Sequence, residues 1–250
     1  MSFIKDSLPI TLENKVKDPT VKTVALGIMA GIYISIGATL YSVLTSLPGN
    51  EALLRFLGAL LFTIGLMLVI FKKAQLFTGN NLMFLNWLNR QTSPKQIARN
   101  WLLVYLGNFL GAILTAALLA LIFSKIEPIR ANLESIALKK TNYTFYVALY
   151  KAVFCNMLVC LAVVLGISFQ DLKRKLIGII APITLFVFLG FEHSIANMFF
   201  IPAGLIVGEV ESAVAFSSFV KNIIPVTLGN IIGGFIISLS YIFIVPKSTR

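Results

Sequence analysis

Long apolar segments recur along this chain of 250 residues, and they constrain its fold more than any other feature. Several exceed about 18 residues, which is long enough for an α-helix to cross about 30 Å of hydrocarbon. Hydrophobic residues make up 58% of the chain and charged residues 12%, whereas a soluble domain is roughly half apolar and about a quarter charged. The sequence therefore predicts an integral membrane protein without a separate soluble domain.

The apolar segments divide into six predicted spans. Their approximate bounds are residues 24–47, 52–70, 101–123, 145–167, 176–206 and 223–245, and apolar residues continue after the second span to about residue 87. We treat residues 1–250 as one all-α transmembrane domain, in which residues 1–21 form a segment outside the spans. The polar N-terminus has no hydrophobic signal region and no cleavage site, so we expect it to be retained.

Basic residues between the spans predict the orientation, because cytoplasmic loops carry more lysine and arginine than external loops. With the N-terminus in the cytoplasm, fourteen basic residues fall on the cytoplasmic side and six on the outer side. We therefore expect a multi-pass protein of the inner (cytoplasmic) membrane with both termini cytoplasmic. The cytoplasmic residues are Lys5, Lys15, Lys17, Lys22, Lys72, Lys73, Arg90, Lys95, Arg99, Lys173, Arg174, Lys175, Lys247 and Arg250, and the outer ones are Arg55, Lys125, Arg130, Lys139, Lys140 and Lys221.

Several function classes do not fit the composition. The net charge of +11 lies between the spans and does not form one basic, aromatic-rich surface, so nucleic acid is not an expected partner. Cys155 and Cys160 lie five residues apart in one apolar span, which indicates packing thiols and no metal site. An enzyme would need a nucleophile with its base, a metal cluster or facing carboxylates. We expect no enzyme activity and no cofactor.

The sequence contains an internal repeat. NWLLVYLGNFLGA (residues 100–112) aligns with NIIPVTLGNIIGG (residues 222–234) at an offset of 122, and the first and fourth spans align more weakly. Three spans repeated as three more must cross the membrane in opposite senses. The sequence therefore predicts an inverted 3+3 repeat, residues 22–123 and 140–246, with its substrate site near the midplane.

The middle span of each half is both long and interrupted. In KKAQLFTGNNLMF, Gly79 and the Asn80-Asn81 pair divide an apolar run. In LGFEHSIANMFFIPAG, Gly190 precedes Glu192 and His193, the only histidine of the chain. Non-helical backbone at membrane depth occurs only where protein buries it or where it lines a cavity. Two interruptions at corresponding places indicate a substrate site, and ordinary kinked helices are the alternative.

Six segments closely resemble, in order, the signature segments of the formate/nitrite transporter family: ALGIMAGIYISIGA, LFTGNN, NWLLVYLGN, NMLVCLAV, GFEHSIANMFFIP and PVTLGNIIGG. The resemblance covers the chain from Lys22 onward and extends to the clostridial hydrosulfide channels. It implies an aquaporin-like six-helix protomer, a homopentamer with one pore per subunit, and passage of formate, nitrite or hydrosulfide through the lipid bilayer. The alternative is an aquaporin-type channel for small neutral solutes, which would show Asn-Pro-Ala at both interruptions.

The resemblance also implies roles for individual residues. Thr78 matches the family's pore threonine, and His193 matches its central histidine. Gly79 and Gly190 fall at the interruptions. The other matching polar pore positions are Asn156, Asn230 and Lys140, and those of the two apolar constrictions are Phe62, Phe186, Leu66, Leu76 and Val159.

The chemistry of a histidine suits such a pore. An anion loses most of its hydration in a bilayer, and histidine exchanges protons easily near neutral pH. As a cation it attracts the anion, and as a donor it hands over a proton, so that a neutral acid passes the constrictions. A bare carboxylate would repel the substrate. We therefore expect Glu192 to face protein, where it accepts backbone hydrogen bonds or pairs with a cation.

Overall fold

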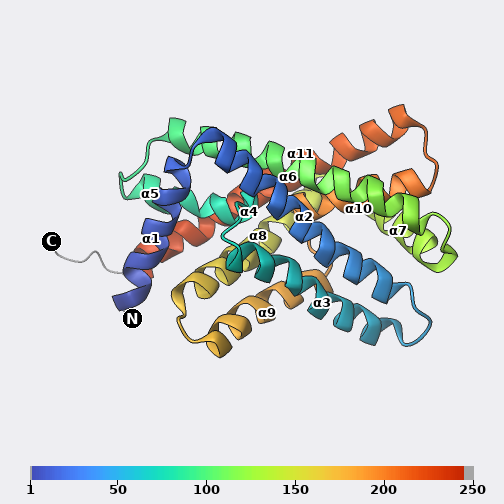
Figure 1. Cartoon of the computed structure of the whole chain (residues 1–250), viewed down its shortest axis with the longest axis horizontal. Coiled ribbons are helices and arrows are strands. Elements are labelled where there is room, and N and C mark those ends of the chain that lie inside the picture. The colour runs from blue at the N-terminus through green and yellow to red at the C-terminus, as the bar shows by residue number, and fades with distance from the viewer. Residues whose placement is uncertain (1, 245–250) are drawn as a thin grey trace.

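The computed structural model describes residues 2–244, and every regular element in that range is a helix (Figure 1). The ends predicted for the sixth span (residue 245) and the second repeat (residue 246) lie outside the described residues, as do Lys247 and Arg250. In chain order the elements are α1 (Ser2–Lys17), α2 (Thr20–Thr45), α3 (Glu51–Phe71), α4 (Phe77–Asn80), the 3₁₀ helix η1 (Asn81–Met83), α5 (Phe84–Leu88), α6 (Pro94–Phe123), α7 (Glu127–Thr141), α8 (Phe145–Ser168), α9 (Leu172–Phe188), α10 (Ser194–Val207) and α11 (Ser212–Ile244).

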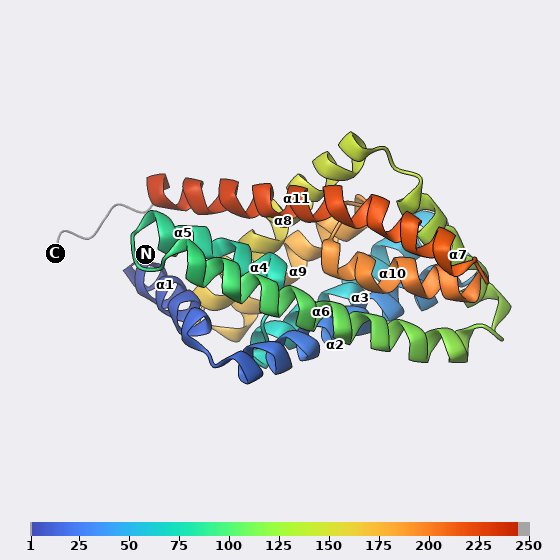
Figure 2. The same ribbon diagram turned by 90° about the horizontal axis from the view of Figure 1, so that it is seen from above.

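Five of the described helices are long and apolar enough to cross a membrane, namely α2, α3, α6, α8 and α11. The predicted fifth span is divided between α9 and the shorter apolar helix α10. The long helices α6 and α11 run along the molecule, the short helix α4 lies among the longer ones, and α10 lies beside α7 toward one end (Figures 1 and 2). A bundle of apolar helices therefore surrounds two short helices.

Glycines bring the long helices into close contact. A Cβ atom on Gly111 of α6 would collide with the carbonyl oxygen of Ile28 of α2. In the same way, a Cβ atom on Gly233 of α11 would collide with the carbonyl oxygen of Val153 of α8. Small residues at such crossings are typical of membrane helices, because packing and not apolar burial holds these helices together.

The first interruption lies earlier than the sequence predicted. Helix α3 ends at Phe71 and α4 begins at Phe77, so residues 72–76 are not helical. The chain turns at Lys73, whose φ of 53° is left-handed, and the next residue donates its N–H to the carbonyl of Val69 at 2.9 Å. Gly79 lies within α4 and packs beside Val163. Gly79 therefore does not lie in the non-helical segment, whereas the Asn80-Asn81 pair lies where α4 ends and the 3₁₀ helix η1 begins.

The second interruption lies where the sequence predicted it. Helix α9 ends at Phe188 and α10 begins at Ser194, which leaves residues 189–193 non-helical. Gly190 has a left-handed φ of 67°, a conformation that glycine adopts without steric cost. The N–H of the following residue bonds to the carbonyl of Phe186 at 3.0 Å, as at the first interruption.

Two helices lie at opposite ends of the molecule, and the sequence predicted neither. Helix α1 lies at one end and α7, in a region expected to be a loop, lies at the other (Figures 1 and 2). Helix α1 buries Leu8, Leu12 and Val16, which share one face. Helix α7 buries Leu133 and Ala137 and packs against α10. Each helix brings a lysine to a cavity described below.

Candidate functional site

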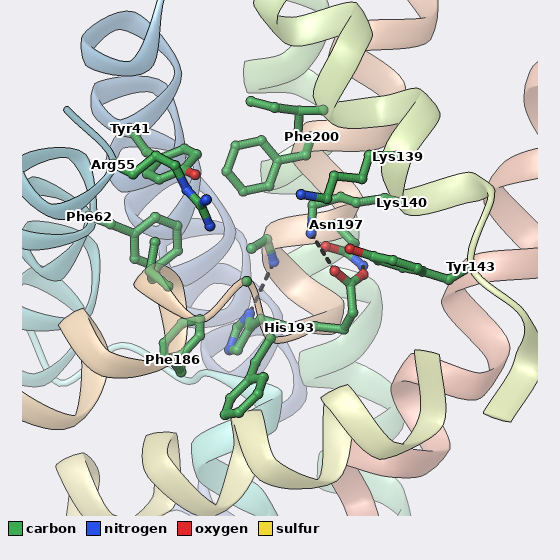
Figure 3. A pocket seen from close by; sticks show the side chains of 16 residues that line it. Tyr41, Arg55, Phe62, Lys139, Lys140, Tyr143, Phe186, His193, Asn197 and Phe200 are labelled. Atoms are coloured by element: carbon green, nitrogen blue, oxygen red, sulfur yellow. Dashed lines mark hydrogen bonds and ion pairs between the residues drawn. The ribbon is translucent and has the colours of Figure 1, made fainter. Parts of the chain in front are cut away.

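A cavity of about 110 Å³, here called the Lys140 cavity, lies on the α7 side of the molecule. Tyr41 and Arg55 lie on one side of it, and Lys140 and Tyr143 lie on the other (Figure 3). His193 lines its deeper part. Three cationic side chains, those of Arg55, Lys139 and Lys140, and the carboxylate of Glu192 therefore border the cavity that His193 lines.

His193 joins the two interrupted segments. Its Nε2 lies 2.9 Å from Thr78 Oγ1, and both side chains are buried. Its Nδ1 accepts the N–H of Ala196 at 3.1 Å and so caps α10. A nitrogen that accepts a hydrogen bond carries no proton, so the neutral ring holds its proton on Nε2. The ring therefore presents an N–H donor to the threonine hydroxyl, and both predicted residues meet at one point.

The five predicted constriction residues occupy different places around this pair. The Phe186 ring stacks on the imidazole of His193, with ring centroids 5.9 Å apart. The Phe62 ring packs edge to face against the Phe186 ring, with centroids 5.8 Å apart. These two phenylalanines border the Lys140 cavity. Leu76 borders the second cavity, described below, whereas Leu66 and Val159 are buried and border neither cavity.

Glu192 forms a buried ion pair. Its Oε1 lies 2.9 Å from Nζ of Lys140, and its Oε2 accepts from Asn197 Nδ2 at 2.6 Å. The carboxylate side chain is 1% exposed and the lysine side chain 14% exposed. Pairing with a cation is one of the two arrangements expected for Glu192, but the residue also lines the Lys140 cavity, whereas the sequence predicted that it faces protein. Lys140, which was expected in a loop, instead lies on α7 with its charge compensated.

Asn230 supports the backbone of the second interruption. Its Oδ1 accepts the N–H of Ser194 at 2.9 Å, and its Nδ2 donates to the carbonyls of Ala152 at 2.8 Å and Glu192 at 3.0 Å. Side-chain amides that satisfy freed backbone groups make such segments possible inside a membrane. Asn230 borders neither cavity, so its position is that of a scaffold residue.

Asn156 supports the same region from α8. Its Nδ2 lies 3.2 Å from the carbonyl oxygen of Thr78 and 2.6 Å from that of Asn230. The Cys160 thiol lies 3.6 Å from the same threonine carbonyl. These groups contact the backbone behind the threonine, whereas its hydroxyl faces the histidine.

Asn108 holds the first interruption in the manner of Asn230. Its Oδ1 accepts the N–H of Phe77 at 2.9 Å, and its Nδ2 donates to the carbonyls of Gly27 at 2.8 Å and Gln75 at 2.9 Å. The two asparagines lie at the repeat offset of 122. The same three backbone bonds are therefore made at both interruptions.

A second cavity of about 530 Å³, here called the Lys15 cavity, lies on the α1 side. Lys15 Nζ donates to Asn80 Oδ1 at 3.0 Å. Burial lowers the pKa of Lys15 to about 8, and nearby Asp18 opposes this shift. Gly79, next to Thr78, also lines this cavity. The other lysines that line it are Lys22, Lys72, Lys73 and Lys175.

Several polar residues of these two regions are not predicted from the sequence. Asn100 and Asn222 open the two aligned segments of the repeat, so the offset of 122 already marked them. Gln75, Asn80 and Asn197 carried no comparable signal. Their neighbours in space are distant in sequence, and single amides form no recognisable motif.

The fold and the site together define a membrane transport protein. Apolar helices surround two lysine-lined cavities that come from opposite ends. The buried pair of Thr78 and His193 lies between them.

Comparison with known proteins identifies the family. Residues 6–244 match the model of the Formate/nitrite transporter family. The chain is 39% identical to a "Probable formate transporter" of Methanothermobacter thermautotrophicus over 89% of this chain and 88% of the relative. It is 34% identical to "Formate channel FocA" of Escherichia coli (strain K12), over 88% and 85% respectively. The chain therefore belongs to the formate/nitrite transporter family, and the expectation of a transport protein and not an enzyme is confirmed.

Solved structures agree. A structure described as "FNT family ion channel" superposes with a TM-score of 0.86 at 27% identity, over 98% of this chain and 99% of that chain. A "Pentameric formate channel with formate bound" superposes with a TM-score of 0.78 at 31% identity, over 90% and 96%. The fold is that of this family's channels.

Proposed function

We propose that this chain forms a homopentameric channel for small monovalent anions of weak acids, with formate, nitrite and hydrosulfide as the candidate substrates. One pore passes through each protomer. The hydrogen bond between His193 and Thr78, placed between two lysine-lined cavities, carries this proposal. The formate channels among the relatives, one of them pentameric with formate bound, support it.

We also propose that the protomer is the inverted 3+3 repeat expected from the sequence, with six spans and residues 22–123 and 140–246 as its halves. In this arrangement α3 with α4, and α9 with α10, are the two interrupted spans. The matching bonds of Asn108 and Asn230 support the repeat. The excess of lysine and arginine on the α1 side supports an inner-membrane orientation with this end in the cytoplasm.

The proposed mechanism neutralises the anion at the centre. The lysines attract it, and it accepts a hydrogen bond from Nε2–H of His193 and one from the hydroxyl of Thr78. For full transfer, Nδ1 takes a proton from a water molecule, which leaves as hydroxide, and Nε2 gives its proton to the anion. Protonation of Nδ1 breaks its hydrogen bond to the N–H of Ala196. The ring is then neutral with its proton on Nδ1, and it returns to the Nε2–H tautomer by proton exchange with water. The neutral acid passes the apolar residues that would stop the ion.

A panel of solutes tests this function. In proteoliposomes, we expect formate, nitrite and hydrosulfide to pass at least about tenfold faster than chloride, which has no usable conjugate acid. Lactate tests the size limit. The measurement is solute flux at two pH values, with empty liposomes subtracted because weak acids cross lipid unaided. Chloride passing as fast as formate would show that neutralisation is not required.

We further propose that the N-terminal segment gates the Lys15 cavity. Its helix α1 buries three apolar side chains and bonds to Asn80 through Lys15. As pH rises through the pKa of about 8, Lys15 loses its charge and its hold on Asn80 weakens. The other charged groups that line this cavity are Asp18, Lys22, Lys72, Lys73 and Lys175.

Deleting residues 1–20 should raise formate flux at saturating formate, where the loss of an anion-attracting lysine does not limit the rate, and should remove the part of its pH dependence that is centred near pH 8. The reason is that the deletion removes both the helix and its titrating lysine. Flux of the full-length and truncated proteins would be measured from about pH 7 to about pH 9. An unchanged pH profile in the truncated pentamer would contradict the gate.

A further inference from the structure

Two groups of polar side chains at opposite ends of the molecule make corresponding hydrogen bonds. In the first group, Gln75 Oε1 accepts from Asn80 Nδ2 at 3.0 Å and from Asn100 Nδ2 at 2.9 Å. The same asparagine, Asn100, also lies 3.2 Å from the backbone carbonyl of Lys15. Gln75 therefore accepts hydrogen bonds from two asparagines, and one of these also contacts the backbone of a lysine.

The second group repeats this pattern with one change. Glu192 Oε2 accepts from Asn197 Nδ2 at 2.6 Å and lies 3.4 Å from Asn222 Nδ2. Asn222 donates to the backbone carbonyl of Lys140 at 2.8 Å. Lys140 thus corresponds to Lys15, and the carboxylate of Glu192 stands where the first half has a neutral amide.

This single change makes the two ends electrically different. Lys140 lies 2.9 Å from a carboxylate oxygen of Glu192, whereas Lys15 donates to the neutral carbonyl oxygen of Asn80. Within the described residues, no carboxylate oxygen lies in ion-pair contact with Lys15. The carboxylate closest to it in the cavity, that of Asp18, pairs with Lys22 at 2.7 Å and accepts from Gln75 Nε2 at 3.1 Å.

The two cavities also differ in size and lining. The Lys15 cavity holds about 530 Å³ against about 110 Å³ for the Lys140 cavity, so an anion enters the former with more of its water. Five lysines and one carboxylate, that of Asp18, line the described part of the Lys15 cavity. A cavity walled largely by one sign of charge concentrates ions of the opposite sign.

We propose that Gln75, by leaving the charge of Lys15 uncompensated, makes the Lys15 cavity the higher-affinity anion entrance of an asymmetric channel. The ligand class is a small monovalent carboxylate or oxyanion. This inference rests on the proposed function.

A passive pore cannot build a gradient, so the ratio of maximal rate to half-saturating concentration is equal from both sides. Tighter binding at this end is therefore matched by a lower maximal rate.

The test supplies the missing carboxylate. Gln75→Glu keeps the acceptor oxygen for both asparagines but places a carboxylate beside Asp18, so it is combined with Asp18→Asn. Formate influx is measured from each side in vesicles of one orientation, selected by an N-terminal tag. In the wild type we expect half-saturation at about fivefold lower formate from the Lys15 side. In the double variant we expect the two sides to be equal within error.

Two further variants isolate the lysine. Lys15→Gln should raise the half-saturating concentration from its own side by about fivefold and leave the other side unchanged. Lys17→Gln is the matched control on the same helix, because Lys17 is exposed and pairs with Glu13. Symmetric half-saturation in the wild type, or asymmetry that persists in the double variant, would overturn the proposal.

A binding measurement separates this proposal from the proposed function. The broadening of the formate carbon resonance by detergent-solubilised pentamer reports anion binding without transport. We expect it to decrease in Lys15→Gln and to persist in Lys17→Gln, whether or not the wild type conducts formate. Absence of formate flux in the wild type would refute the proposed function alone, whereas equal broadening in both variants would refute the role of Lys15.

Discussion

Replacing His193 with asparagine should lower formate flux through the reconstituted protein by roughly a hundredfold, since a positioned proton donor typically contributes at least that much. The imidazole places Nε2–H 2.9 Å from the Thr78 hydroxyl at the point between the two cavities. Asparagine offers a hydrogen bond there but no proton at neutral pH. Flux would be measured in proteoliposomes with formate and chloride in parallel.

The asparagine substitution is suited to this test because it preserves the helix start. His193 Nδ1 caps α10 by accepting the N–H of Ala196, and asparagine is among the preferred capping residues. Thr78→Val serves as the companion variant. It keeps the shape of the side chain, removes the hydroxyl and leaves the histidine, so we expect a smaller loss. Wild-type formate flux in a well-assembled His193→Asn pentamer would refute the central role of the histidine.

The sequence was sufficient to predict the features that repeat or that carry rare chemistry. Apolar length identified the membrane helices, and the single histidine beside Gly190 marked the second interruption. Thr78 and His193 lie 115 residues apart in sequence, and the family resemblance placed both in the pore. Their direct contact follows from the two short helices α4 and α10, which bring the interruptions together.

The sequence was misleading where local preference and tertiary packing disagree. Glycine is a common helix breaker, so the sequence places the first interruption at Gly79 and the two asparagines that follow it. The chain instead turns at Lys73, because this residue adopts the left-handed conformation that Gly190 adopts in the other half. Helix α7 was missed for a related reason: packing on α10, and not intrinsic propensity, stabilises a short helix of mixed polarity.

The buried ion pair could not be predicted, because its partners come from separate elements. The sequence left open whether Glu192 would accept backbone hydrogen bonds or pair with a cation. Lys140 is 52 residues away, and the loop expected around it gave no reason to bury its charge. The ion pair forms because α7 places the Lys140 ammonium beside the carboxylate of Glu192 at the second interruption.

Glu192→Gln should destabilise the protein by about 3 kcal/mol or more, because it leaves the Lys140 ammonium without its counterion. Glutamine preserves an acceptor for Asn197 and Asn222, so hydrogen bonding alone predicts a much smaller loss. The stability of the detergent-solubilised pentamer would be measured as the temperature at which half of it remains assembled. A variant as stable as the wild type but unable to conduct formate would give Glu192 a direct role in transport.

The first half of the chain shows that the stability lost in Glu192→Gln depends on how well water can hydrate the unpaired lysine. There Gln75 takes the place of Glu192, so no carboxylate contacts the ammonium of Lys15, and the larger cavity of about 530 Å³ leaves room for water to hydrate it. The Lys140 cavity of about 110 Å³ offers much less. Removing both charges, in Lys140→Gln with Glu192→Gln, should therefore restore most of the stability lost in the single variant, since no unpaired charge remains. Equal losses in the single and double variants would show that the carboxylate stabilises the interruption independently of the lysine.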